Sequence, residues 1–213
     1  SFKKNFTLSG LNLAFIGYYN INKIKLANNL YLWPDGIFSN RFFYKVKKIP
    51  GRTLIKEISL PDSIKQIYVL GNLSERSKAY LENLYSKKII HIKLPYGDVE
   101  DLFNKYCKID FKESDLIILT LPTPKQEQLA QKIRDNSEFY KILCVGGAVS
   151  MASGEEKQIP HFIENNGLEF LWRLRTDTLR RFKRLLISFS SYSYGYLTMN
   201  YKKFQKILVR EVI

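Results

Sequence analysis

Cysteine and histidine are scarce in this chain. Its 213 residues include two cysteines, Cys107 and Cys144, and two histidines, His91 and His161. Both cysteines lie in apolar surroundings, so we expect buried free thiols in a reducing compartment instead of a disulfide framework. Neither histidine has a convincing ligand partner nearby, and no Asp-x-Asp motif is present. The sequence therefore predicts no metal site.

Long apolar runs are also missing. No stretch approaches the ~20 apolar residues that are needed to cross a bilayer. No signal peptide is visible, and the chain starts at Ser1 without Met, so native residues could precede it. The one dense acidic cluster, Asp98-Val99-Glu100-Asp101, is expected to stabilise the N-terminus of a helix.

Positive charge is plentiful. Lys and Arg number 34 against 20 acidic residues, which gives a formal net charge of +14. Such a charge favours an anionic partner, whether nucleic acid, an anionic membrane surface or a phosphorylated substrate. Residues 168–213 carry half of it, with ten of the basic residues and three of the acidic ones.

Short apolar segments alternate with helical patterns before this basic segment. The predicted strands are 12–19, 30–32, 66–70, 89–94, 115–121 and 141–145. The predicted helices are 20–29, 37–44, 72–86, 98–107 and one that begins at Thr123, while Pro50-Gly51 is interpreted as a turn. The alternation predicts an α/β fold with a Rossmann-like, mostly parallel sheet and helices on both faces.

The pattern of residues 168–213 predicts an amphipathic helical appendage. From Leu168 onward, apolar residues fall near one helical face and basic residues cover the rest, with a break at Thr176-Asp177-Thr178. Such helices can lie in a bilayer interface, where each basic residue near an anionic leaflet adds ~1 kcal/mol. The alternative is a basic helix packed on the domain. We divide the chain into a core, 1–167, and an appendage, 168–213.

Four turns follow predicted strands and are the candidate site. They are Trp33-Pro34-Asp35-Gly36, Gly71-Asn72, Thr123–Glu127 and Val145-Gly146-Gly147-Ala148. In an open α/β sheet such turns gather along the edge where ligands bind. Asp35 supplies a carboxylate there, which can act as a base or can form only an Asx turn before Gly36.

The ordered motifs resemble those of the bacterial WecG/TagA/CpsF glycosyltransferases, the N-acetylmannosaminyltransferase type. The resemblance runs from about Tyr31 to Arg184. Its segments are Pro34-Asp35-Gly36, Ile49–Arg52, Val69-Leu70-Gly71, Pro95-Tyr96-Gly97, Pro124–Glu127, Val145–Ala148 and Gly167–Leu174. Three segments depart from the family: Leu121-Pro122-Thr123 replaces a Gly-rich turn, Ser150 replaces a common acidic residue, and Tyr18-Tyr19-Asn20 is the nearest counterpart of a Thr-x-Asn segment.

The resemblance implies an inverting, metal-independent enzyme without a cofactor. It would move a hexose or N-acetylhexosamine, N-acetylmannosamine by default, from a UDP-sugar to a polyprenyl-diphosphate-linked glycan for surface polysaccharide or teichoic acid synthesis. It also implies a cytoplasmic protein that associates with the anionic inner membrane leaflet. It does not decide whether the protein forms a homo-oligomer. The alternatives are a nucleic-acid-binding protein, which the lack of a recognised motif disfavours, and a noncatalytic sugar-nucleotide binder.

The resemblance also implies roles for individual residues. Asp35 is the expected base, and the cations Arg173, Arg180, Arg181 and Arg184 are candidates to clamp the departing diphosphate. Membrane attraction or solubility is the alternative for these arginines. The expected substrate-binding residues are Asn20, Gly71, Thr123, Lys125, Gln126, Gly146 and Gly147.

Each substrate-binding residue also has a structural interpretation. Gln126 can complete a capping box with Thr123, and Asn20 can cap a helix. Lys125 can be a solvated surface lysine instead of a phosphate ligand. The glycines Gly71, Gly146 and Gly147 can serve plain turn geometry instead of close approach to a nucleotide.

Overall fold

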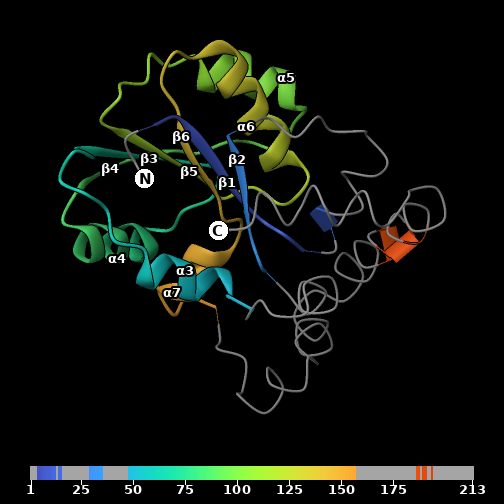
Figure 1. Ribbon diagram of the computed structural model, residues 1–213, viewed down its shortest axis with the longest axis horizontal. Helices are drawn as coiled ribbons and strands as arrows, with labels where there is room; N and C mark the ends of the chain where they lie inside the picture. Colours follow the sequence, from blue (N-terminus) through green and yellow to red (C-terminus); the bar gives the residue numbers. More distant parts are fainter. Residues whose placement is uncertain are drawn as a thin grey trace.

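The computed structural model describes residues 4–12, 14–15, 29–35 and 48–156, and in the appendage residues 186, 187, 189, 190 and 193. Six parallel strands form one sheet in the order β2-β1-β6-β5-β3-β4 (Figure 1). The strands are β1 Phe6–Gly10, β2 Leu30–Trp33, β3 Gln66–Leu70, β4 Lys88–Ile92, β5 Asp115–Leu119 and β6 Lys141–Cys144.

Helices cover both faces of this sheet. They are α3 Gly51–Glu57, α4 Glu75–Tyr85, α5 Val99–Leu102, the π-helical turn η1 Phe103–Cys107, α6 Lys125–Asn136 and α7 Ala148–Ala152. Figure 1 shows α5 and α6 on one side of the strands and α3, α4 and α7 on the other. The predicted α/β fold, with a parallel sheet covered on both faces, is confirmed.

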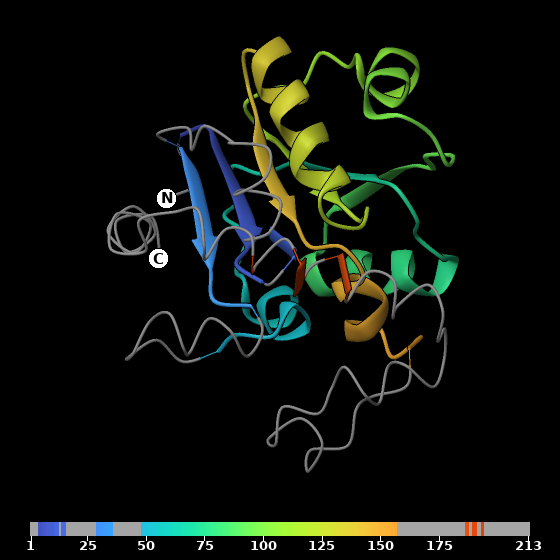
Figure 2. The same cartoon turned by 90° about the vertical axis from the view of Figure 1, so that its right-hand side faces the viewer.

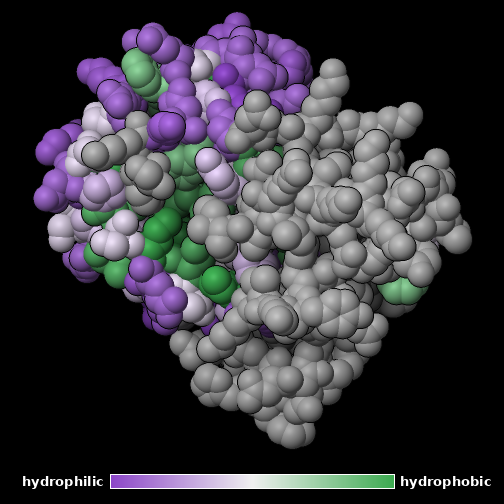
Figure 3. Space-filling view, in the orientation of Figure 1, coloured by the Kyte–Doolittle hydropathy of each residue, from purple (hydrophilic) through white to green (hydrophobic). Residues whose placement is uncertain are grey.

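Alternation along the strands builds two separate cores. In β5, Leu116 and Ile118 pack with α3, α4 and α7, whereas Ile117 and Leu119 pack with α5, η1 and α6. Successive strand side chains point to opposite faces, so a strand that is covered on both sides is apolar throughout. Figure 3 shows the outer surface over α5 and α6 as mainly hydrophilic, with apolar residues appearing lower on the same face.

The first strand lies earlier than the sequence pattern indicated. The predicted strand at 12–19 is wrong, because residues 14 and 15 are helical and β1 is Phe6–Gly10. The Asn12 side chain explains the change, since its Oδ1 accepts a hydrogen bond from the Phe15 backbone N–H at 3.0 Å. An asparagine in this position favours the start of a helical turn over an extended chain.

Two short helices were also missed. Pro50-Gly51 does not form a plain turn, because Pro50 precedes the first residue of α3 and Ile55 in that helix is fully buried. Helix α7 follows the Gly146-Gly147 turn, and it packs against α3. Both helices are short, so packing and not intrinsic propensity stabilises them. The predicted helices 20–29 and 37–44 lie outside the described residues.

Candidate active site

A cavity of about 430 Å³ lies at the carboxyl ends of the strands. Its described lining comes from the ends of β1, β2, β5 and β6, from Asn72 after β3, from the first turn of α6, and from the α7 region as far as Glu156. Figure 2 shows β2, β1 and β6 side by side with their arrowheads toward α3 and α7. This is the edge where open parallel α/β sheets bind ligands, so the turns singled out in the sequence meet at one site.

Asp35 lines this cavity at the end of β2. Its Oδ2 accepts a hydrogen bond from Asn12 Nδ2 at 3.4 Å. Because Asn12 Oδ1 already accepts from the Phe15 N–H, the Asn12 amide can present only its NH₂ group to the carboxylate. The first helical turn after β1 therefore orients the side chain that holds Asp35.

The absence of a side chain at Gly10 makes room for Asp35. A Cβ on Gly10 would lie 3.0 Å from Trp33 Cζ2 and 3.1 Å from both Cβ and Oδ2 of Asp35. Trp33 also lines the cavity, and within the described residues its buried indole N–H has no hydrogen-bond partner. We call these four residues, Gly10, Asn12, Trp33 and Asp35, the β1–β2 wall.

Gln126 also lines the cavity and is almost completely buried. Its Oε1 accepts from the Gly146 backbone N–H at 2.9 Å, and its Nε2 donates to Thr123 Oγ1 at 3.1 Å. The predicted contact between Gln126 and Thr123 is therefore present, although α6 begins at Lys125 and has no side-chain cap. Thr123, Gln126, Gly146 and Gly147 all line the cavity, and we call them the α6–β6 wall.

Two predicted substrate-binding residues do not line the cavity. Lys125 Nζ donates to the Gly97 carbonyl at 2.5 Å and lies 5.0 Å from the centre of the Tyr96 ring, a cation–π distance. Gly71 has a φ of +125°, and a Cβ there would lie 2.5 Å from Thr120 Oγ1, so its turn requires glycine. The neighbouring Asn72 lines the cavity instead.

The remaining predicted site residues are not described by the structure. Asn20 and the four candidate clamps Arg173, Arg180, Arg181 and Arg184 lie outside the described residues. Asn12, and not Asn20, is the asparagine that follows the first strand. The sequence pattern missed Asn12 and Gly10 because the aromatic residues of 12–19 have high strand propensity and drew the strand prediction away from Phe6–Gly10.

The described lining carries negative and no positive side chains. Asp35 and Glu156 contribute carboxylates, and no Lys, Arg or His belongs to the part of the lining that the structure describes. Within the same part of the chain, no group of three His, Cys, Asp or Glu residues could hold a metal ion. A diphosphate bound here would need cations from another part of the chain.

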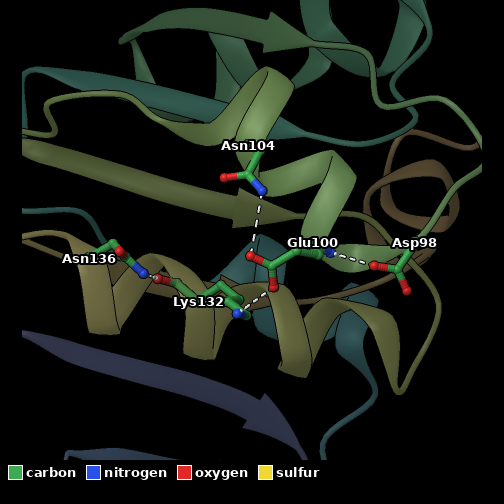
Figure 4. A network of polar contacts seen from close by, with 5 residues as sticks. All are labelled: Asp98, Glu100, Asn104, Lys132 and Asn136. Carbon is green, nitrogen blue, oxygen red and sulfur yellow. Dashed lines mark hydrogen bonds and ion pairs between the residues drawn. The ribbon is translucent and has the colours of Figure 1, made fainter.

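The cysteines and the acidic cluster behave as the sequence suggested. Cys107 and Cys144 are both buried and free, and burial raises the pKa of Cys107 to about 12. Asp98 Oδ1 accepts from the Glu100 backbone N–H at 2.8 Å and so caps α5, while Glu100 pairs with Lys132 of α6 at 2.5 Å (Figure 4). The predicted helix-stabilising role of the acidic cluster is confirmed.

The family comparison agrees with these observations. Among the described residues, no helix has the length and apolar character that crossing a membrane requires. The sequence model of the glycosyl transferase WecG/TagA/CpsF family matches residues 40–206, which include the α6–β6 wall and most of the chain. The cavity at the strand ends and this match lead to one conclusion: the chain belongs to the WecG/TagA/CpsF family, whose members are glycosyltransferases of cell-envelope polysaccharide synthesis.

Proposed function

We propose that the protein is an inverting, metal-independent glycosyltransferase with Asp35 as its general base. It transfers a hexose or N-acetylhexosamine from a UDP-sugar to a polyprenyl-diphosphate-linked glycan. The observation that carries the proposal is the position of Asp35 in the same cavity as Gln126 and the Gly146-Gly147 turn. Family membership supports sugar transfer in general, and the donor, the acceptor and the metal independence belong to the proposal.

The proposed chemistry uses Asp35 and Asn12 together. The acceptor hydroxyl attacks the anomeric carbon, its proton passes to the Asp35 carboxylate, and UDP leaves from the opposite side of the sugar. Asn12 Nδ2 donates to Oδ2 of Asp35 and so orients the carboxylate that takes the proton. A positioned carboxylate of this kind accelerates such a reaction by roughly 10²–10⁴-fold.

The leaving diphosphate needs positive charge that the described lining lacks. The proposal assigns this role to one or more of Arg173, Arg180, Arg181 and Arg184 in the appendage. Arginine suits it because its guanidinium can donate two hydrogen bonds at once to a phosphate. The requirement for cations from outside the described cavity supports this assignment.

The same appendage is the proposed membrane contact. Its net positive charge would attract the anionic inner leaflet, where the lipid-linked acceptor lies. Leu186, Ile187 and Phe189 are 53–56% exposed, which supports a membrane contact through apolar side chains of this segment. Membrane attraction and phosphate binding would then occur in one segment, which closes the site near the acceptor.

Asp35→Asn tests the proposal. The amide keeps the shape of the side chain but cannot accept the proton, so UDP release with a lipid-diphosphate acceptor should fall at least ~100-fold. UDP-sugar affinity by calorimetry should change little. Asp62→Asn, at an exposed aspartate outside the cavity lining, is the control for charge. Full turnover by Asp35→Asn would refute the assignment of the base, and loss of turnover after dialysis against EDTA would refute metal independence.

A further inference from the structure

The carboxylate of Glu127 accepts several hydrogen bonds next to the residues that line the cavity. Glu127 is the third residue of α6, and its Oε1 accepts from Ser9 Oγ at 2.8 Å, Gln126 Nε2 at 2.9 Å and Thr123 Oγ1 at 3.2 Å. Its other oxygen, Oε2, is buried and has no hydrogen-bond partner among the described residues. Glu127 does not line the cavity, but Thr123 and Gln126 do.

These contacts differ from those of an ordinary helix cap. In a capping box, a glutamate at this position accepts from the backbone N–H of the cap residue. Here the three neighbouring residues that donate to Oε1 do so through their side chains, and Ser9 comes from β1, 118 residues away in the sequence. The carboxylate therefore joins the end of β1 to the α6–β6 wall, which a role confined to the first turn of α6 would not require.

Glu127 and Gly146 together fix the orientation of the Gln126 amide. Gln126 Nε2 donates to Glu127 and Thr123, and Gln126 Oε1 accepts from the Gly146 N–H. A flipped amide would place its oxygen against the carboxylate and its NH₂ against the Gly146 N–H, so both contacts would be repulsive. Both hydrogens of Nε2 are already used, and Oε1 keeps one free lone pair.

Thr123 is constrained in the same way. Its hydroxyl accepts from Gln126 Nε2 and donates its single hydrogen to Glu127 Oε1. Neither Thr123 nor Gln126 therefore has a hydrogen left for a ligand, and each offers a lone pair. This side of the cavity presents hydrogen-bond acceptors, which suit a ligand group rich in hydroxyl or amide donors.

We infer that Glu127 is a positioning residue that makes Thr123 and Gln126 present acceptors to the hydroxyl or N–H donors of the transferred sugar. The inference rests on the proposed function for the identity of the ligand. UDP also carries donors, in its ribose hydroxyls and its uracil N–H, whereas its diphosphate carries none. The inference assigns the acceptors to the transferred sugar, so Glu127 should affect the affinity that the sugar adds and not the affinity for UDP.

Glu127→Ala and Glu127→Gln separate this role from a structural one. Alanine removes all three acceptor contacts, whereas glutamine can keep them through its own Oε1 and place its NH₂ where Oε2 lies. The affinities for UDP and for UDP-N-acetylmannosamine are measured by calorimetry for both variants. In Glu127→Ala we expect the affinity for the UDP-sugar to fall about tenfold and the affinity for UDP to stay unchanged. In Glu127→Gln we expect the UDP-sugar affinity to match that of the wild type.

A second measurement reads the Gln126 amide directly in the free protein. In side-chain NMR spectra, the Gln126 NH₂ signals are assigned by their loss in Gln126→Leu. They should exchange slowly in the wild type and in Glu127→Gln, and quickly in Glu127→Ala. Glu57→Ala, at an exposed residue of α3, controls for loss of one negative charge and should leave exchange and both affinities unchanged.

Three results would overturn the inference. They are slow Gln126 exchange in Glu127→Ala, an equal loss of UDP and UDP-sugar affinity in that variant, and a Glu127→Gln variant as impaired as Glu127→Ala. The proposed function fails separately, if the wild-type protein binds the UDP-sugar no better than UDP and transfers no sugar. In that case the exchange measurement still decides whether Glu127 positions Gln126.

Discussion

Helix α6 contributes to two hydrogen-bonded clusters that each contain a glutamate, and the surroundings of the two glutamates differ. On the inner side, Glu127 accepts from three neutral side chains, and burial raises its pKa although these hydrogen bonds lower it in part. On the outer side, Glu100 of α5 pairs with Lys132 in water, and this hydrogen-bonded pairing lowers the pKa of Glu100 (Figure 4). The pKa values of two glutamates are thus shifted in opposite directions by their surroundings.

The difference shows where this fold is sensitive to change. When an exposed ion pair is broken, water solvates both charges, so the pair contributes little to the free energy of unfolding. A buried carboxylate and its partners have no water to replace a lost contact, so each change leaves an unpaired polar atom. We therefore expect large effects around the cavity and small effects on the outer side of α6.

The largest effect on activity is expected for Gly10→Ala. The new methyl group would meet Trp33 and Asp35 at 3.0–3.1 Å, which forces the proposed base away from its position. Overpacking of this kind costs ~1–3 kcal/mol, and a displacement of about 1 Å can reduce turnover ~100-fold. Transfer assays and thermal unfolding measure the two effects.

Gly97→Ala is the matched control for this prediction. Its Cβ would meet only Leu102, at the ordinary distance of 3.7 Å. Both properties should therefore stay near the wild-type values. If Gly10→Ala and Gly97→Ala have the same activity and the same thermal stability, the close fit of Gly10 against Asp35 does not position the proposed base.

Gln126→Glu should have the largest effect on stability. It places a second carboxyl group against Glu127 Oε1, where the structure has an N–H donor at 2.9 Å. Two buried carboxylates at this distance must share a proton, so the variant should lose ~2 kcal/mol or more at neutral pH and recover part of it in acid. Urea unfolding at several pH values measures this loss, and Gln131→Glu on the exposed side of α6 should show none of it.

A moderate effect is expected in the pH dependence of stability. The raised pKa of Glu127 means that the folded protein holds a proton that the unfolded chain releases above about pH 4.5, so this group costs stability as the pH rises. The lowered pKa of Glu100 has the opposite sign: its contribution is present above about pH 4.5 and is lost as the pH falls.

Two isosteric variants test these signs. Glu127→Gln should gain stability relative to the wild type as the pH rises from about 4.5 toward neutral, because it removes the buried ionisation. Glu100→Gln should lose stability only above about pH 4.5. Urea unfolding from acid to neutral pH measures both, and parallel curves for the two variants would contradict the comparison.

The smallest effect is expected for Lys132→Met. The Lys132 side chain is 43% exposed and its partner Glu100 is 56% exposed, so solvent and salt screen their attraction. Thermal unfolding should change slightly at low ionic strength and not at high ionic strength. A large, salt-independent loss would mean that the outer pair matters as much as the contacts under the cavity.

Pattern and composition predicted much of this molecule. Strand β3 has the predicted bounds, 66–70, and the other strands from β2 onward end within two residues of their predicted limits, because short apolar runs between turn residues specify buried parallel strands. The first strand was misplaced because Phe6–Gly10 has few strand-forming residues. It forms a strand because it lies between β2 and β6 and pairs with both of them.

The candidate site divides in the same way. The Asp35, Thr123, Gln126 and glycine positions follow strands, so the sequence could place them at one edge of the sheet. Gly10 and Ser9 could not be found from local patterns, because their importance depends on what faces them. Lys125 shows the converse, since its motif suggested a phosphate ligand and the structure has it on Gly97 and Tyr96.

The sequence by itself determined the α/β class, the buried thiols, the turns that hold the candidate residues and the family. The tertiary structure decided which of those residues face one another, such as Ser9 with Glu127 and Gly10 with Asp35. The physical reason is that periodicity and turn chemistry act over a few residues, whereas these contacts join segments that only the order of strands in the sheet brings together.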